Sequence, residues 1–364
     1  MEELVDLAAD LIAIRSTADR PDELERALTF VLGVVGPGFT VERFASSGKP
    51  SALVRTEGSS GPFRVMLNAH LDVVPGADGQ FTPRRDGERL YGRGAQDMKV
   101  AAIVMASVFR ELARSVPYPL GLQLVTDEEV GGFDGTGHQV DRGVRAGFVV
   151  IGEQSRLQVV TESKGLAHVR LRATGRAAHA AYPWLGENAV VAVMAGVQRL
   201  LERYPSPAEE AWRTTANVAR IETGNRAVNQ VPAEAEAWID LRFPPGDADF
   251  DRRTKEEVAE HLRAVTGVDV EVRALGAPHR ADPDSDDVGQ LRQVVRDVGF
   301  PGTLLRKHGA ADGRFYYAHG IDAVIFGPGG DGQHGADEYA DLTTVEPYRQ
   351  ALTAFLRTVS PRSR

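Results

Sequence analysis

Residues 63–72 read FRVMLNAHLD, a short apolar run that ends in a histidine and an aspartate. Three later stretches follow the same plan, at residues 120–129, 148–153 and 323–334, and each leads into acidic residues or a histidine. Short apolar runs with β-branched residues are typical of buried parallel strands. In an open α/β sheet, ligands bind beyond the carboxyl ends of the strands. The sequence therefore predicts a sheet that gathers His, Asp and Glu at one edge, as a metal site would.

The order of the expected elements divides the chain into two parts. Helices alternate with strands in the first part, which predicts an α/β domain with a mainly parallel sheet. From about residue 164 the order becomes strand, helix, strand, strand, helix, strand, which is typical of a ferredoxin-like α+β unit. The parallel pattern resumes after Pro278. We therefore expect one large domain formed by residues 1–163 and 276–364, with a smaller domain inserted at 164–275.

The composition narrows the chemistry that is open to this chain. Its 364 residues, of which 42% are hydrophobic, suffice for one large domain or two ordinary ones. There is no cysteine, so disulfides and thiolate ligands are excluded, and any metal must be held by oxygen and imidazole. A net charge of −9 disfavours nucleic acid and anionic membranes as partners. Neither a membrane span nor a secretory signal is recognisable, so we expect a cytoplasmic enzyme.

The first candidate ligands have ordinary structural explanations when each is considered alone. His70 and Asp72 lie two apart at a strand end and point to the same side, where a carboxylate can orient an imidazole. The same spacing is as often a turn with a capping aspartate. Asp97 follows a glycine-rich turn that lacks the lysine and hydroxyl residue of a phosphate-binding loop. Asp97 is therefore either a helix cap, which is favoured in isolation, or a carboxylate that bridges two metals.

The remaining candidates lie at later strand ends and in loops. Residues 127–129 read DEE, and three adjacent acids repel one another, so the simple interpretation is a solvated turn, although the run before them looks buried. The alternative is that divalent metals relieve the repulsion and leave one glutamate to carry a proton. Glu153 ends another buried run and aims at the same edge. His334 lies in a glycine-rich loop whose backbone can approach a ligand closely. His179, considered alone, is typical of a surface histidine.

Together these segments resemble the large family of di-zinc amidohydrolases and exopeptidases. The family includes aminoacylase, acetylornithine deacetylase, succinyl-diaminopimelate desuccinylase, carboxypeptidase G-type enzymes and carnosinase-like dipeptidases. The resemblance spans nearly the whole chain. It rests on five segments in the order of the family: HLDVVP at 70–75, GRGAQDMK at 92–99, DEE at 127–129, GE at 152–153, and His334 with DEY at 337–339.

The resemblance implies a site with two divalent metal ions. His70 and Glu153 are expected to bind one ion, and Glu129 and His334 the other. Asp97 is expected to bridge them. The ions are expected to be zinc, with cobalt or manganese as alternatives, because a set of His and carboxylate ligands accepts all three.

The resemblance also implies how the reaction is catalysed. Asp72 would orient His70, and Glu128 would be the general base that takes a proton from a water activated by the two metals. The carbonyl oxygen that gains charge needs a hydrogen-bond donor. In the family this donor is the histidine that matches His179.

The inserted domain is implied to be a lid and a dimerisation surface that contributes to substrate binding. His179 is often supplied by the neighbouring subunit, so we expect a homodimer. Asn229 matches a substrate-contacting asparagine, and Arg242 matches an arginine that binds a substrate carboxylate. Arg242 has the simpler alternative of pairing with surface acids. Arg314, in a DGRF segment, resembles another substrate-side residue.

The chain departs from the family at three places. Asn68 replaces the usual glycine before Ala69, which we expect to be harmless. Residues 308–312 read HGAAD and lack the Gly-Thr-Ser usual in many deacylases. Ser163 and Leu166 stand where a succinyl-diaminopimelate desuccinylase has arginine and serine, which counts against that activity.

These features predict a metal-dependent hydrolase that cleaves an amide bond next to a free carboxylate. The first expectation is the deacylation of a small N-acyl amino acid. The alternative is a dipeptidase or carboxypeptidase that uses the same metals. A non-catalytic binding protein on the same scaffold would be expected to lack a ligand or Glu128, and all of them are present.

Overall fold

The computed structural model describes residues 1–361 and divides into two compact units. The large unit consists of Met1–Thr161, Arg280–Arg306 and Ala311–Arg364, and the inserted unit consists of Glu162–His279 and Lys307–Ala310. Residues 362–364, at the end of the expected segment 276–364, lie outside the described part.

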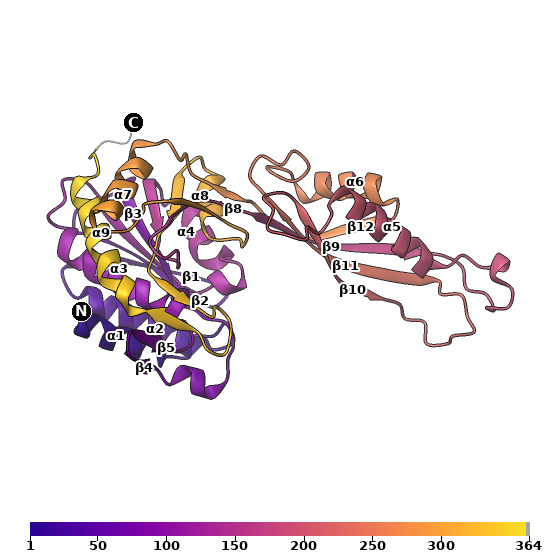
Figure 1. The fold of residues 1–364 in the computed structure, drawn as a ribbon, viewed down its shortest axis with the longest axis horizontal. Helices are drawn as coiled ribbons and strands as arrows, with labels where there is room; N and C mark the ends of the chain where they lie inside the picture. The colour runs from indigo at the N-terminus through magenta and orange to yellow at the C-terminus, as the bar shows by residue number, and fades with distance from the viewer. Residues whose placement is uncertain (362–364) are drawn as a thin grey trace. The chain divides into compact units, whose positions relative to one another are not determined.

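A nine-stranded sheet forms the core of the large unit (Figure 1). In chain order its strands are β1 (Phe39–Ser46), β2 (Lys49–Thr56), β3 (Phe63–His70), β6 (Leu120–Val125), β7 (Ala146–Ile151), β8 (Val159–Ser163), β13 (His279–Arg280), β14 (Leu304–Lys307) and β15 (Asp322–Ile325). Their spatial order is β1-β2-β6-β3-β7-β15-β8-β13, with β14 beside β8. Strand β3 is parallel to β6 and β7, and β7 is parallel to β15. The predicted α/β fold with a mainly parallel sheet is therefore confirmed at its centre.

The central strand β3 is buried along its whole length. Leu67 lies between Leu122 of β6 and Val150 of β7, and His70 pairs with Val125 at the carboxyl end. Strands that are covered on both faces carry continuous apolar runs rather than alternating ones. The run at residues 63–72 therefore reflects the position of this strand in the middle of the sheet.

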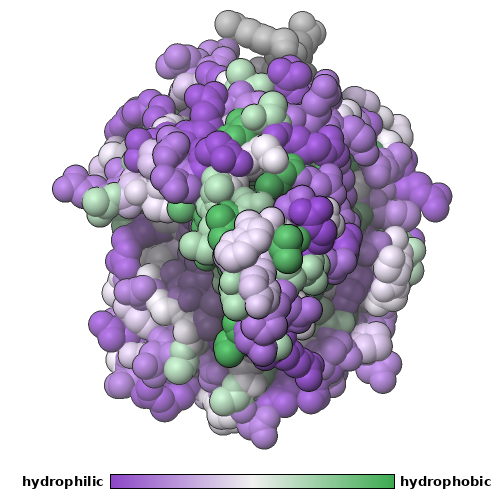
Figure 2. Space-filling view, turned by 90° about the vertical axis from the view of Figure 1, so that its right-hand side faces the viewer, coloured by the Kyte–Doolittle hydropathy of each residue, from purple (hydrophilic) through white to green (hydrophobic). Residues whose placement is uncertain are grey.

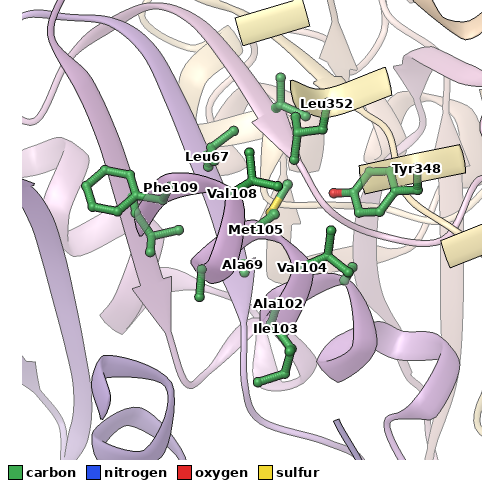
Figure 3. Close-up of a cluster of buried hydrophobic side chains, with 14 of the residues drawn as sticks. Leu67, Ala69, Ala102, Ile103, Val104, Met105, Val108, Phe109, Tyr348 and Leu352 are labelled. Atoms are coloured by element: carbon green, nitrogen blue, oxygen red, sulfur yellow. The ribbon is translucent and has the colours of Figure 1, made fainter. Parts of the chain in front are cut away.

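Helix α3 (Val100–Leu112) packs against one face of the sheet. It is buried on nearly all sides, as a helix that is apolar all round must be. Figure 3 shows its side chains between Leu67 and Ala69 of β3 and the residues of α9 (Val345–Thr358), among them Tyr348. This packing fixes the start of α3, and hence the segment before it, against the strand that ends in His70.

The remaining helices cover both faces of the sheet. The hydrophobic cluster that holds α3 also includes residues of α1 (Glu2–Ile12), α2 (Pro21–Val35) and α7 (Asp286–Asp297). The cluster on the other face includes residues of α4 (His138–Asp141) and α8 (Gly313–Tyr317). No helix within residues 1–361 combines the length and apolar character needed to cross a membrane.

A small second sheet in the large unit has the order β16-β17-β5-β4, formed by β4 (Arg84–Asp86), β5 (Arg89–Tyr91), β16 (Gly329–Asp331) and β17 (Tyr339–Asp341). The pairing of β17 with β5 brings the loop of His334 next to the chain that leads to Asp97. Two segments far apart in sequence are thereby held side by side.

The inserted unit has the ferredoxin-like arrangement that the sequence predicts. Its elements are β9 (Gly165–Thr174), α5 (Ala189–Arg203), β10 (Thr215–Glu222), β11 (Glu234–Phe243), α6 (Lys255–Thr266) and β12 (Asp269–Gly276). The sheet order is β10-β11-β9-β12, with every pair antiparallel, and both helices lie on one face (Figure 1). Alternate residues of β9 and β11 are buried against these helices, so the opposite face carries the polar side chains.

Candidate metal centre

Three neighbouring strands deliver acidic and histidine side chains to one edge of the main sheet. His70 is the last residue of β3, residues 127–129 follow β6, and Glu153 comes two residues after β7. His334 reaches this site from the loop between β16 and β17. Because β6, β3 and β7 lie next to one another, their carboxyl ends meet at the same place.

Asp97 lies between two histidines. Its Oδ1 is 2.9 Å from Nε2 of His70, and its Oδ2 is 3.5 Å from Nε2 of His334. Gln333 donates a hydrogen bond of 2.5 Å to Oδ2, and His334 is also 3.1 Å from Oε2 of Glu129. One carboxylate thus faces both histidines, one with each oxygen.

The candidate ligands form two groups that are compact enough for metal ions. The first contains His70, Glu128 and Glu153, and the second contains Asp97, Glu129 and His334. Within each group the ligand atoms all lie within 4.8 Å of one another. Glu128 belongs to the first group, so its position is compatible both with a ligand and with a proton carrier beside the ion.

Asp72 orients both His70 and the backbone of the acidic turn. Its backbone carbonyl is 3.1 Å from Nδ1 of His70, closer than its carboxylate oxygen at 3.6 Å. The carboxylate accepts hydrogen bonds from the backbone N–H groups of Glu128 at 3.2 Å and Glu129 at 3.0 Å. A fully buried aspartate therefore fixes both a histidine ligand and the backbone of the acidic turn.

The interpretation of Asp97 as a helix cap is wrong. Asp97 has φ −122° and ψ 94°, and α3 begins only at Val100, after the segment Ala95–Lys99. Its carboxylate oxygens face the two histidines and Gln333 instead of the first turn of α3. The helix start is stabilised by packing against the sheet, which leaves this carboxylate for the site.

The electrostatics of the site favour cations. Burial, followed by the charge of Glu153, raises the pKa of the Glu128 carboxyl well above its usual range. Burial and the charge of Asp97 raise the pKa of Glu129 to about 7. Burial opposes ionisation of Asp97, but hydrogen bonds from His334 and His70 outweigh it and lower the pKa. Buried carboxylates with histidines and no thiolates are a donor set that fits divalent ions, which relieve the mutual repulsion.

A buried polar network lies behind β3, and it involves Asn68. Asn68 Nδ2 donates to Oε1 of Gln123 at 2.8 Å and to Oγ1 of Thr136 at 3.0 Å. Thr136 in turn donates at 2.6 Å to Asp312, whose pKa burial raises to about 7. The substitution of glycine by Asn68 therefore adds an anchor between β3 and the chain that follows Glu129.

Arg314 is buried in the large unit. Its guanidinium donates to the backbone carbonyl of Gly131 and lies 5.5 Å and 4.9 Å from the ring centroids of Phe133 and Phe315. In this arrangement the side chain supports the loop that follows Glu129.

The other three predicted residues, His179, Asn229 and Arg242, belong to the inserted unit. His179 is exposed, and its Nδ1 accepts a hydrogen bond of 3.1 Å from the backbone N–H of Ala181. Asn229 is exposed, and its backbone carbonyl accepts a hydrogen bond from the backbone N–H of Ala180, next to His179. Arg242 donates through Nε and Nη2 to Asp240 at 2.7 and 2.9 Å.

One residue and one contact that hold the ligands from behind were not predicted from the sequence. Gln333 binds Asp97, and Asp72 has its second role on the acidic turn. Gln333 lies next to His334 in the printed sequence, so its position was the available hint. The hydrogen bonds of Asp72 could not be read from spacing, because they join segments 56 and 57 positions apart.

The fold and the donor set together define a metal-dependent hydrolase in which an α/β unit carries an inserted α+β unit. The sequence profile of Peptidase family M20/M25/M40 matches residues 66–358, and the chain belongs to this family. The resemblance to metal-dependent amidohydrolases and exopeptidases is thereby confirmed.

Known proteins that resemble this chain have several activities in their names. A probable carboxypeptidase from Aspergillus terreus is 34% identical over 326 residues, which are 82% of this chain and 72% of the relative. A succinyl-diaminopimelate desuccinylase from Alkalilimnicola ehrlichii is 29% identical over 372 residues, 95% of this chain and 96% of the relative.

Solved structures share the fold. An aminopeptidase from Bacillus cereus has a TM-score of 0.78 at 18% identity, with 98% of each chain covered. An M20 family metallo-carboxypeptidase from Sulfolobus solfataricus has a TM-score of 0.74 at 17% identity, with 98% of this chain and 99% of the other covered. The fold predicted from the order of elements is that of these enzymes.

Proposed function

We propose that this metallohydrolase removes the acyl group from a small N-acyl amino acid by hydrolysing the amide bond next to a free carboxylate. The observation that carries the proposal is the position of Asp97, which offers one oxygen to each of two histidines. A carboxylate in this position suits a pair of divalent ions, which are typical of hydrolytic sites.

The proposed ions are zinc, with cobalt or manganese as alternatives. His70 and Glu153 would hold one ion, and Glu129 and His334 would hold the other. Asp97 would bind both ions. Ions bound there would supply Lewis-acid activation of water and of a carbonyl oxygen.

Glu128 is proposed as the general base. Its carboxylate lies within 4.8 Å of the ligand atoms of His70 and Glu153, within reach of a water at that position. Burial raises the pKa of its carboxyl above the usual range. Glu128 takes a proton from the attacking water and then donates it to the leaving amine.

His179 is proposed as the donor to the carbonyl oxygen that gains charge. Because the backbone N–H of Ala181 donates to Nδ1, the neutral ring must carry its proton on Nε2. The exposed ring is therefore ready to donate from Nε2 to an oxyanion. It does so in the same chain or in the second subunit of a dimer.

The substrate carboxylate is proposed to bind Arg242. A guanidinium pairs with a carboxylate through two parallel hydrogen bonds, and Arg242 makes this kind of contact with Asp240. A substrate carboxylate would replace Asp240 as the partner. Asn229 is proposed to contact the substrate beside His179, and Arg314 to act on the substrate side through the loop that it supports.

A homodimer through the inserted unit is part of the proposal. Two large apolar residues of α5, Val191 and Met194, are 61% and 56% exposed, and they lie on the same side of the helix. Figure 2 shows a largely hydrophilic face on which hydrophobic residues lie among polar ones. Exposed groups of this kind mark interaction surfaces. We also place the enzyme in the cytoplasm, which its lack of cysteine supports.

A carboxypeptidase or dipeptidase that uses the same site is the second candidate. The similarity to a probable carboxypeptidase favours it. Within the acylase proposal, Ser163 and Leu166 argue against a succinylated substrate. The decisive experiment measures the metal content of the purified protein and its turnover of N-acetyl amino acids, N-succinyl amino acids, dipeptides and folate-like glutamates. Faster turnover of dipeptides or of the glutamates than of every acyl amino acid would overturn the first candidate in favour of the second.

A mixture of subunits tests where His179 acts. Glu128→Gln and His179→Ala subunits are expected to be inactive alone. If His179 acts across a dimer, mixing them creates sites with both native residues and restores part of the activity. If it acts within its own chain, the mixture remains inactive.

A further inference from the structure

A buried ion pair, Arg93 and Glu338, connects the two segments that carry Asp97 and His334. The side chains of the pair are only 3% and 1% exposed. Arg93 lies in the turn before Asp97, and Glu338 precedes β17, four residues after His334. Neither residue is among the candidate ligands.

Glu338 fixes the backbone that leads to Asp97. Its Oε1 accepts hydrogen bonds from the N–H groups of Gly94 at 2.9 Å, Gln96 at 3.1 Å and Asp97 at 3.2 Å. Gly94 has a φ of 85°, and a Cβ there would lie 2.7 Å from the side chain of Val73. The turn therefore needs glycine, and the carboxylate gathers the amides that the turn presents.

Arg93 fixes the loop of His334. Its Nη1 donates to Glu338, and its Nη2 donates to the backbone carbonyls of His334 at 3.0 Å and Gly335 at 3.2 Å. His334 has a φ of 61°, in the left-handed region that costs energy for a residue other than glycine. The guanidinium thus holds the histidine backbone in a conformation that it would not adopt by preference.

Stability is a poor explanation for this pair. A buried ion pair loses so much hydration that an apolar replacement of similar volume is often as stable. What an apolar pair could not do is accept three amides on one segment and donate to two carbonyls on another. We conclude that the pair fixes the position of the segment of Asp97 relative to the loop of His334.

We propose that Arg93 and Glu338 are positioning residues that set the affinity for metal at the group formed by Asp97, Glu129 and His334. The inference rests on the proposed function, because that function makes these three residues metal ligands. The pair keeps the ligand oxygen of Asp97 and the ring of His334 at a fixed spacing before any ion arrives. A preformed spacing lowers the cost of binding, as do other groups that orient ligands.

Two conservative variants test the proposal. Arg93→Lys keeps the charge but cannot reach Glu338 and both carbonyls at once. Glu338→Gln keeps the shape but turns an amide donor towards Arg93. For each, metal-free protein is titrated with Zn²⁺ by calorimetry at a temperature well below unfolding. We expect at least one of the two zinc equivalents to bind about 10–100-fold more weakly, and kcat to recover at saturating zinc.

The matched control is a second arginine–carboxylate pair of the large unit, in which the side chains of Arg64 and Asp287 are 4% and 18% exposed. Arg64 donates to Asp287 at 2.5 Å and to the carbonyl of Ser360 at 2.7 Å. Arg64→Lys also perturbs a largely buried arginine pair, but it should bind zinc like the native protein. The proposal is overturned if neither Arg93→Lys nor Glu338→Gln weakens zinc binding more than this control does. It is also overturned if saturating zinc fails to restore kcat.

The same titration separates this inference from the proposed function. Native protein that binds zinc but hydrolyses no member of the substrate panel contradicts the function and leaves the positioning result intact. Native protein that is active, with variants that bind zinc normally, contradicts only the positioning role. Native protein that takes up no zinc, cobalt or manganese would overturn both.

Discussion

The proposed metal ligands of the large unit and the proposed substrate residues of the inserted unit are held in opposite ways. Asp72 and His70 are almost fully buried, and the carboxylate of Asp72 binds two backbone amides. His179 and Asn229 are exposed, on a part of the inserted unit outside its regular helices and strands. The first region is fixed before any ligand arrives, whereas the second presents its groups to solvent.

This difference divides the proposed reaction between a preorganised half and an adaptable half. Groups that hold cations and move protons must be in place beforehand, because reorganisation during the reaction raises the barrier. Groups that recognise the substrate can be brought to it as a lid closes. Variants in the first half should therefore change metal binding or chemistry, and variants in the second should change chemistry without changing metal content.

The largest effect is expected from Glu128→Gln, which tests the preorganised half. Loss of the proposed general base should reduce kcat by about 10²–10⁴-fold while two metal ions per chain remain. Steady-state kinetics and elemental analysis measure both quantities. The neighbouring Glu129→Gln is the matched control and should lose metal. Loss of metal in the Glu128 variant instead would identify Glu128 as a ligand.

A somewhat smaller effect is expected from His179→Ala, which tests the adaptable half. Removal of one oxyanion donor typically costs about 10²–10³-fold in kcat. Because the ring is exposed, the Tm and the metal content should stay at native values. His168→Ala, an exposed histidine near Asp240 in the same unit, should be neutral. Unchanged kinetics in the His179 variant would remove that residue from the mechanism.

Asp72→Asn tests how far the metal ligands depend on the hydrogen bonds that the Asp72 carboxylate accepts from the acidic turn. The amide keeps one acceptor but loses the other, so the acidic turn is held less firmly. We expect metal affinity to fall by about 10–100-fold, measured by competition with a chromogenic chelator. Affinity within twofold of native protein would mean that the buried strand ends alone fix the ligands.

The smallest expected effect is a dependence of metal-free stability on pH. Burial raises the pKa of Asp312 from 3.8 to about 7, so the folded state keeps a proton that the unfolded state releases. This contribution is complete below about pH 4 and is lost as the pH rises through 7. The Tm of chelator-treated protein should therefore fall by a few degrees over this range. Glu128 and Glu129, whose pKa values are also raised, contribute to the same slope, so Asp312→Asn should make it smaller without removing it. An equal slope in that variant would exclude Asp312 as a contributor.

The parts of the structure that could be predicted from the sequence are those that depend on local periodicity. The ends of β3, β6 and β7 were predictable because apolar runs mark buried strands, and parallel strands deliver their next residues to one edge. The ferredoxin-like unit was predictable because strand and helix periodicities alternate in a recognisable order. Asp97 was misjudged in isolation, since an aspartate before a helix usually caps it. Its non-helical backbone depends on contacts with Glu338, 241 positions away.

The sequence by itself determined the fold class, the inserted unit and the delivery of His70, the acidic residues 127–129 and Glu153 to one edge of the sheet. Local periodicity carries this information, because burial and strand direction act on neighbouring residues. Only the tertiary structure decided that Asp97 faces two histidines, that Asp72 holds the acidic turn and that Arg93 meets Glu338. These contacts join segments as far as 245 positions apart, and packing of the whole unit, rather than any local pattern, brings them together.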